Sequence, residues 1–162
     1  MGRYICYNGA VPTTGAQVPV TLTNAQKTQL QLTAASTGQL EIVEWGYSFG
    51  VNAALEAAVQ VELLTTAAVA GTGQTAVTPT KLDRPNDVAS AVTAGFTPTA
   101  EGTIATVRMF ESRQTVPLGD WYKQFPLGER PIVDVSQVLR VRTNTPALST
   151  YPGFICYVVW CE

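Results

Sequence analysis

The chain has 162 residues, of which 46% are apolar and only 14% are charged, whereas an average soluble domain carries about 25% charged residues. A chain of this length forms one domain by default and buries enough surface to fold without a metal or a disulfide. It contains no histidine, which excludes hydrolases with a histidine base and histidine-bound zinc or iron centres. We therefore expect a protein that is not an enzyme and that holds no metal or cofactor.

The balance of charge disfavours nucleic acids and membranes as partners. Ten Lys and Arg residues stand against twelve Asp and Glu residues, and the basic residues form no cluster of the kind that neutralises phosphates. No apolar run approaches the roughly 18 residues of a membrane span. The first residues lack the apolar stretch of a secretory signal, so we expect synthesis in the cytoplasm, with Cys6, Cys156 and Cys161 reduced.

Residues 1–20 predict an extended N-terminal arm, because glycine and proline recur through them. Residues 21–162 predict a single β-sandwich domain, and Val18–Thr23 and the extreme N-terminus are counted among the expected strands. The tripeptide Ile-Cys-Tyr occurs at both ends of the chain, at 5–7 and 155–157. Chance explains such a short repeat; if it has a meaning, it indicates two similar strands in similar surroundings.

Three further strands are expected in the first half, at Lys27–Thr33, Gln39–Phe49 and Ala57–Leu63. The first and third alternate polar and apolar residues, which is typical of strands with one buried face. The middle run changes register halfway along. This change predicts a β-bulge, or a switch between sheets, near Val43 and Glu44.

The stretch Thr65–Thr103 interrupts this pattern, because it is rich in Ala, Thr and Gly and contains three prolines. Two interpretations stay open: a short helix from Arg84 to Val92, or a long irregular excursion between two strands. Long connections in compact domains are usually functional or covered by a partner. The stretch is therefore a candidate contact surface.

The second half returns to short β-prone runs, at Ile104–Glu111, Trp121–Phe125, Pro131–Val135, Val138–Thr143 and Phe154–Trp160. With the earlier runs, about nine or ten strands of ordinary length are expected. Proline and glycine mark the turns between them. The chain is thus predicted to be an all-β protein, an antiparallel β-sandwich of the jelly-roll kind.

Arginine and aromatic side chains of this half are candidates for a subunit interface, where arginine is favoured over lysine. The candidates are Arg108, Arg113, Trp121, Tyr122, Arg140 and Arg142. The simpler alternative is an exposed sheet face with cross-strand pairs. A third interpretation is an aromatic platform for sugars built from Trp45, Tyr47, Trp121 and Tyr122, although a Trp in an alternating strand more often belongs to the core.

Paired carboxylates are a catalytic arrangement that the absence of histidine leaves open, since they suffice for glycoside hydrolysis. Glu41 with Glu44, and Asp83 with Asp87, are close enough in sequence to be considered. Exposed or turn-capping roles explain both pairs more simply.

Several segments resemble small β-sandwich proteins from the structural modules of tailed bacteriophages and prophages. They are KTQLQLT at 27–33, EWGYSFG at 44–50, VELLTTAAVAGTGQTAVTPTKLD at 61–83, QFPLGERPIV at 124–133 and LRVRTNT at 139–145. The resemblance includes decoration (cement) proteins of the capsid exterior, commonly trimers. It implies a structural virion protein that forms a homo-oligomer, most simply a trimer, and binds the major capsid protein. A carbohydrate- or receptor-binding virion module, or another head or tail protein, is the alternative.

Overall fold

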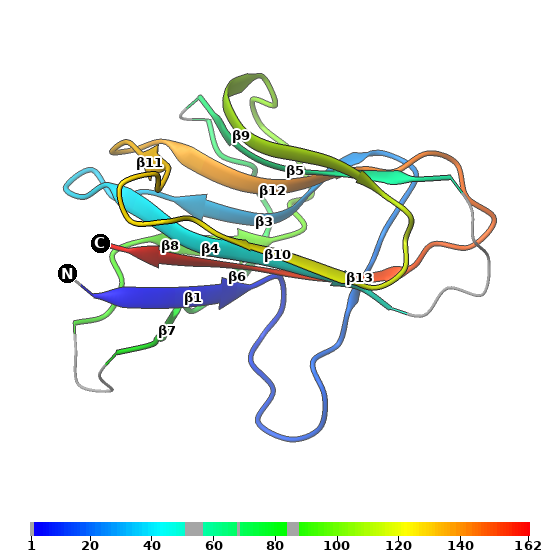
Figure 1. Ribbon diagram of the computed structural model, residues 1–162, viewed down its shortest axis with the longest axis horizontal. Helices are drawn as coiled ribbons and strands as arrows, with labels where there is room; N and C mark the ends of the chain where they lie inside the picture. The colour runs from blue at the N-terminus through cyan, green and yellow to red at the C-terminus, as the bar shows by residue number, and fades with distance from the viewer. Residues whose placement is uncertain (1, 51–56, 68, 84–87) are drawn as a thin grey trace.

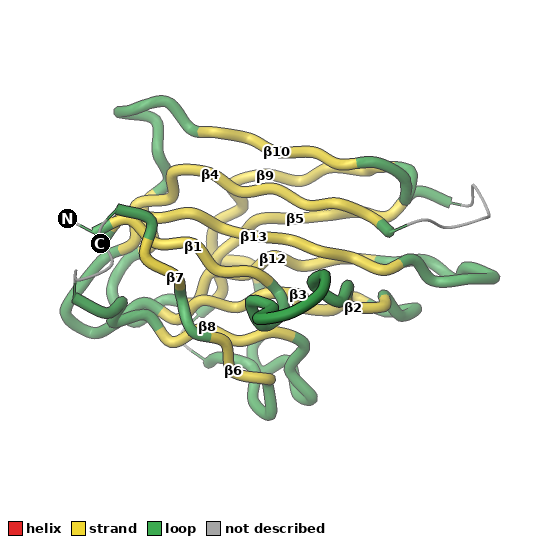
Figure 2. Tube along the Cα trace, turned by 90° about the horizontal axis from the view of Figure 1, so that it is seen from below, coloured by secondary structure: helices red, strands yellow, loops and turns green. Residues whose placement is uncertain are grey.

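The fold is a sandwich of two antiparallel sheets, seen in a computed structural model that describes residues 2–50, 57–67, 69–83 and 88–162 (Figures 1 and 2). Sheet A contains, in spatial order, β10 (Asp120–Gln124), β4 (Leu40–Phe49), β13 (Gly153–Cys161), β1 (Arg3–Tyr7) and β7 (Thr80–Lys81), with β11 (Ile132–Val133) on β4 and β2 (Val20–Thr21) on β13. Sheet B contains β6 (Thr75–Val77), β8 (Thr93–Phe96), β3 (Gln26–Thr33), β12 (Val138–Asn144), β5 (Val59–Thr66) and β9 (Thr106–Thr115). The predicted all-β sandwich is confirmed.

The change of register predicted within β4 is a β-bulge at Val43. Glu44 pairs with Val159 and Ile42 pairs with Trp160, so Val43 is an extra residue without an opposite partner. Because side chains alternate along a strand, an extra residue is needed for Ile42 and Trp45 to point to the same side. Both are fully buried.

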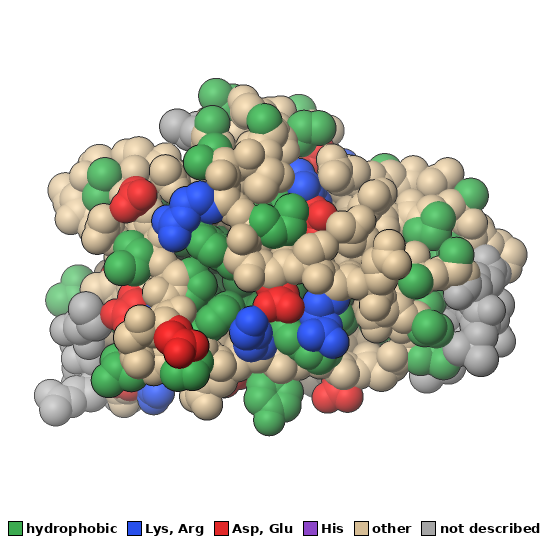
Figure 3. All heavy atoms as spheres, turned by 45° about the horizontal axis from the view of Figure 1, so that its top comes forward, with side chains coloured by type: hydrophobic (Ala, Val, Ile, Leu, Met, Phe, Trp, Pro, Cys, Tyr) green, Lys and Arg blue, Asp and Glu red, His purple; other side chains and the backbone are tan. Residues whose placement is uncertain are grey.

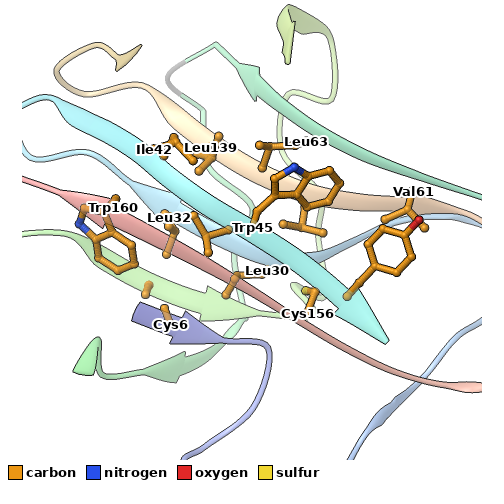
Figure 4. Close-up of a cluster of buried hydrophobic side chains, with 14 of the residues drawn as sticks. Cys6, Leu30, Leu32, Ile42, Trp45, Val61, Leu63, Leu139, Cys156 and Trp160 are labelled. Carbon is orange, nitrogen blue, oxygen red and sulfur yellow. The ribbon is translucent and has the colours of Figure 1, made fainter. Parts of the chain in front are cut away.

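The core lies between the two sheets and is made from the inward positions of both. Figure 4 shows the packing of the labelled side chains, which come from sheet A (Cys6, Ile42, Trp45, Cys156, Trp160) and from sheet B (Leu30, Leu32, Val61, Leu63, Leu139). All of them are at most 2% exposed. All three cysteines are free thiols.

The N-terminal residues differ from the expected arm. Arg3–Tyr7 form β1, which pairs with β13 on one side and with β7 on the other. Tyr4 and Cys6 are buried in the core, so an apolar strand rather than an arm begins the fold. Only residues 8–19 form a loop without strand structure, and Figure 1 shows it extending away from the sheets.

The stretch predicted as an excursion crosses between the two sheets, because β6 and β8 belong to sheet B and β7 to sheet A. Residues 84–87, where the alternative helix would begin, lie outside the described residues. Val88–Val92 form no helix. Nor does any other described part of the chain form a helix long and apolar enough to cross a membrane.

Candidate functional site

Arg140 on β12 is fully buried and lies under the excursion. Its neighbours Leu139 and Val141 point into the core, so Arg140 points to the outer face of sheet B. The guanidinium donates to side-chain oxygens of Thr28, Thr66 and Glu101 and to backbone oxygens of Val69, Glu101 and Thr103 at 2.7–3.3 Å. The excursion therefore covers this face, and Arg140 is one of the side chains whose hydrogen bonds hold it there, together with Gln31.

Arg142, two residues further along β12, has the same role beside it. Its Nε donates to Glu62 on the adjacent β5 at 2.8 Å, and Nη1 donates to the backbone oxygen of Ile104 at 2.9 Å. Arg142 and Glu62 are each only 5% exposed. Burial lowers the pKa of Arg140, while the nearby Glu101 carboxylate raises it.

Arg140 and Arg142 do share one sheet face, as their spacing predicts, but that face is not a free surface. Neither the exposed-face interpretation nor contact with another subunit fits their burial within the chain itself. Alternation shows which side of a strand a residue occupies. It carries no information about a distant segment that covers that side.

Arg113 and Trp121 meet at the flank of the sandwich where β9, the edge of sheet B, faces β10, the edge of sheet A. The Arg113 guanidinium lies 4.6 Å from the centre of the Trp121 ring. Beside it, Lys123 on β10 forms an ion pair with Glu111 on β9 at 2.5 Å. These cross-sheet contacts close the flank with charged and aromatic groups, where a core would place aliphatic ones.

Arg108 extends the same flank toward β11. Its Nη1 donates to the backbone oxygen of Ile132 at 2.7 Å, and its guanidinium lies 4.9 Å from the centre of the Phe110 ring. Arg108 is nevertheless exposed. Arg108, Arg113 and Trp121 thus lie together on one flank and are accessible in part.

Tyr122 does not join this flank, although it follows Trp121 in the sequence. Successive strand residues point to opposite sides, so Tyr122 lies on the outer face of sheet A, where it is 64% exposed. Trp45 is fully buried. Tyr47 is buried in the core as well, so the four residues considered for an aromatic platform do not share one surface.

Exposed large hydrophobic side chains are concentrated in the segment of the chain that contains β9, β10 and β11. Nine of the fourteen in the described residues lie between 104 and 135: Ile104, Val107, Met109, Val116, Leu118, Tyr122, Leu127, Ile132 and Val135. Figure 3 shows charged side chains of both signs beside hydrophobic ones on the face that it views, with uncharged polar atoms over much of the rest. We refer to Arg108, Arg113, Trp121 and these residues other than Tyr122 as the flank surface.

The carboxylates considered for catalysis have structural partners. Glu41 forms an ion pair with Arg130 at 3.1 Å, Asp83 forms one with Arg3 at 3.2 Å, and Glu44 accepts a hydrogen bond from Tyr157. Asp87 lies outside the described residues. Within the described ranges, no three His, Cys, Asp or Glu residues are grouped so that they could hold a metal ion.

The repeated Ile-Cys-Tyr tripeptide marks a feature that no other sequence signal indicated. The two copies lie on the adjacent strands β1 and β13, where Tyr7 pairs directly with Tyr157. Their rings are 5.7 Å apart on the outer face of sheet A.

Comparison of the chain with protein-family models, with curated proteins and with solved structures finds no match.

Proposed function

We propose that the chain is a non-enzymatic structural protein of a phage virion, a jelly-roll-like β-sandwich that forms a homotrimer and decorates the capsid by binding across capsomer junctions. The virion assignment is supported by the resemblance of the segments between Lys27 and Thr145. The observation that carries a role in protein–protein contact is the concentration of exposed hydrophobic residues on the flank surface.

The flank surface has the composition of a protein interface. Interfaces are enriched in arginine, methionine and aromatic residues and depleted in lysine, and the flank surface contains Arg108, Arg113, Met109 and Trp121. The guanidinium of Arg113 is already held against an aromatic ring, which lowers the entropy lost when a partner packs on it. Contact between flank surfaces of neighbouring copies, or between them and the capsid protein, would bury these residues.

A decoration protein acts by mass action. A molecule that binds only the assembled lattice stabilises that lattice by an amount that grows with its concentration and affinity. No reaction is required, which agrees with a sequence free of histidine and with carboxylates that are engaged in structural contacts.

Variants of the flank surface test the contact directly. Met109→Lys and Leu118→Lys place a charge at residues that are 46% and 45% exposed, so they leave the core intact and introduce repulsion into the contact. Val18→Lys, at a residue that is 79% exposed in the 8–19 loop, is the matched control. We expect light scattering to show that the flank variants dissociate while Val18→Lys assembles as the wild type does.

The virion assignment has its own test, the position of the gene. A place beside a major capsid gene, together with sedimentation of the purified protein with assembled capsids, supports decoration. A wild-type protein that does not bind capsids and stays monomeric at micromolar concentration contradicts the proposed decoration of the capsid.

A further inference from the structure

The outer face of sheet A is open, in contrast to the outer face of sheet B, and it carries a row of three tyrosines. Tyr122 on β10 pairs with Gly46 on β4, Gly46 pairs with Tyr157 on β13, and Tyr157 pairs with Tyr7 on β1. Directly paired residues point to the same side of a sheet. We call Tyr122, Tyr157 and Tyr7 the tyrosine row.

Gly46 allows the middle ring of the row to lie along the sheet. A Cβ atom at position 46 would be 2.8 Å from Cε1 of Tyr157 and 2.9 Å from Cβ of Tyr122, so the Tyr157 ring occupies the space that a side chain would fill. The Tyr157 hydroxyl donates to Glu44 at 2.5 Å. These contacts fix the orientation of the ring before any ligand arrives.

The row borders a shallow depression of about 260 Å³, which Ser48, Asp120 and Ile155 also line. Asp120 is exposed, and its carboxylate has no hydrogen-bond or ion-pair partner among the described residues. A carboxylate and a hydroxyl thus stand at the edge of a surface of aromatic rings. Such a combination of apolar surface with a few polar groups that converge on it is typical of ligand sites.

We infer that the tyrosine row with Ser48 and Asp120 is a binding site for a neutral oligosaccharide. The face of an aromatic ring carries partial negative charge, and one face of a sugar ring presents C–H groups with partial positive charge. Asp120 and Ser48 would accept hydrogen bonds from sugar hydroxyl groups at the edge of the stack. The row crosses three strand spacings, about 14 Å, which suits a short oligosaccharide better than a single sugar.

The charge of this face argues against other ligands that stack on aromatic rings. Nucleic acids and acidic sugars need lysine or arginine along the site, whereas the charged groups beside the tyrosine row are the carboxylates of Asp120 and Glu44. Quaternary ammonium groups favour rings that enclose them as a cage. Here the Tyr157 ring lies along the sheet over Gly46 and leaves its side toward the solvent open.

Titration of the full chain with cellohexaose, maltohexaose and chitohexaose, followed by calorimetry, tests the site. We expect one of these neutral sugars to bind and Tyr122→Ala to weaken that binding at least about tenfold, since one stacked ring is lost. Tyr122→Phe keeps the ring and should bind nearly as the wild type does. Val18→Ala, at a residue 79% exposed in the 8–19 loop and outside both the tyrosine row and the flank surface, is the matched control.

The same titrations are run with the Met109→Lys variant, so that failure of the sugar site is distinguished from failure of the proposed oligomer. Binding to either form supports the site, whatever the oligomeric state. Absence of binding of all three sugars to both forms at roughly 1 mM would overturn the inference. Binding of choline or of an acidic sugar in their place, or an equal loss in Val18→Ala, would overturn it as well.

Discussion

Replacement of Arg140 by methionine should strongly destabilise the fold, because a fully buried guanidinium holds the excursion on sheet B. Its loss removes the guanidinium donor from the backbone oxygens of Val69, Glu101 and Thr103, and it removes one of the two cationic partners of the Glu101 carboxylate, which keeps Lys27. Removing one member of a buried ion pair costs about 3–5 kcal/mol. That is a large share of the roughly 5–15 kcal/mol by which domains are stable.

Urea unfolding measures this cost. With a slope of about 2 kcal/mol per molar, the midpoint for Arg140→Met should fall by roughly 2 M. Arg3→Met is the matched control, because its ion pair with Asp83 is largely exposed and should contribute at most about 1 kcal/mol. Hydrogen exchange should accelerate first at Thr72 and Thr103, whose amides bond within the excursion.

A free energy of unfolding for Arg140→Met within about 1 kcal/mol of that of the wild type, together with unchanged hydrogen exchange in the excursion, would contradict this expectation. In that case the hydrogen bonds to the excursion would contribute nothing net. A loss of stability equal to that of Arg3→Met would lead to the same conclusion.

Three further outcomes are expected. Gly102→Ala should destabilise the protein more than Gly128→Ala in thermal unfolding. Both glycines have positive φ, but of the two only Gly102 would place a Cβ against a backbone oxygen, that of Ala70 at 2.4 Å. Equal effects of the two substitutions would contradict this expectation. Burial raises the pKa of Cys6 to about 12. The stabilising effect of its neutral thiol should therefore be complete below pH 9 and be lost as the pH rises toward 12. The stability of Cys6→Ala, measured over the same range, should lack this loss. In the native state an aromatic disulfide reagent should modify Cys161, the one partly exposed thiol, before the buried ones, and simultaneous modification of all three would show that the core opens readily.

Much of the fold could be predicted from the sequence, because one buried face leaves a period of two. Alternation predicts the strands around Lys27–Thr33 and Ala57–Leu63, and the interrupted alternation of Gln39–Phe49 has the bulge at Val43 as one of its expected explanations. The extreme N-terminus is counted among the expected strands but is assigned to an arm, because turn-forming residues directly after Tyr7 separate it from the other runs.

The candidate site was less accessible to sequence reasoning, because it depends on which strands are neighbours. Trp121 and Arg113 are eight residues apart, and only the topology brings β9 and β10 together at one flank. Tyr122, Gly46 and Tyr7 are distant in sequence, and only the register of sheet A aligns them.

The shortage of charge now has a structural explanation within the chain itself. Gln31 and Glu62 occupy outward positions of sheet B, where charged or polar groups usually meet solvent, yet both are buried. Gln31 bonds to Gly71 and Gln74 of the excursion. Because uncharged Ala, Thr and Gly residues cover this face, its side chains are not in contact with solvent and need not be charged.

The proposed trimer contact through the flank surface is tested by the mass of the wild-type particle in solution, compared with that of Met109→Lys. We expect the wild-type particle to have three times the mass of the 17.3 kDa chain at micromolar concentration, and Met109→Lys to be monomeric. A wild-type monomer, or a trimer that Met109→Lys and Leu118→Lys leave intact, would contradict a contact through the flank surface.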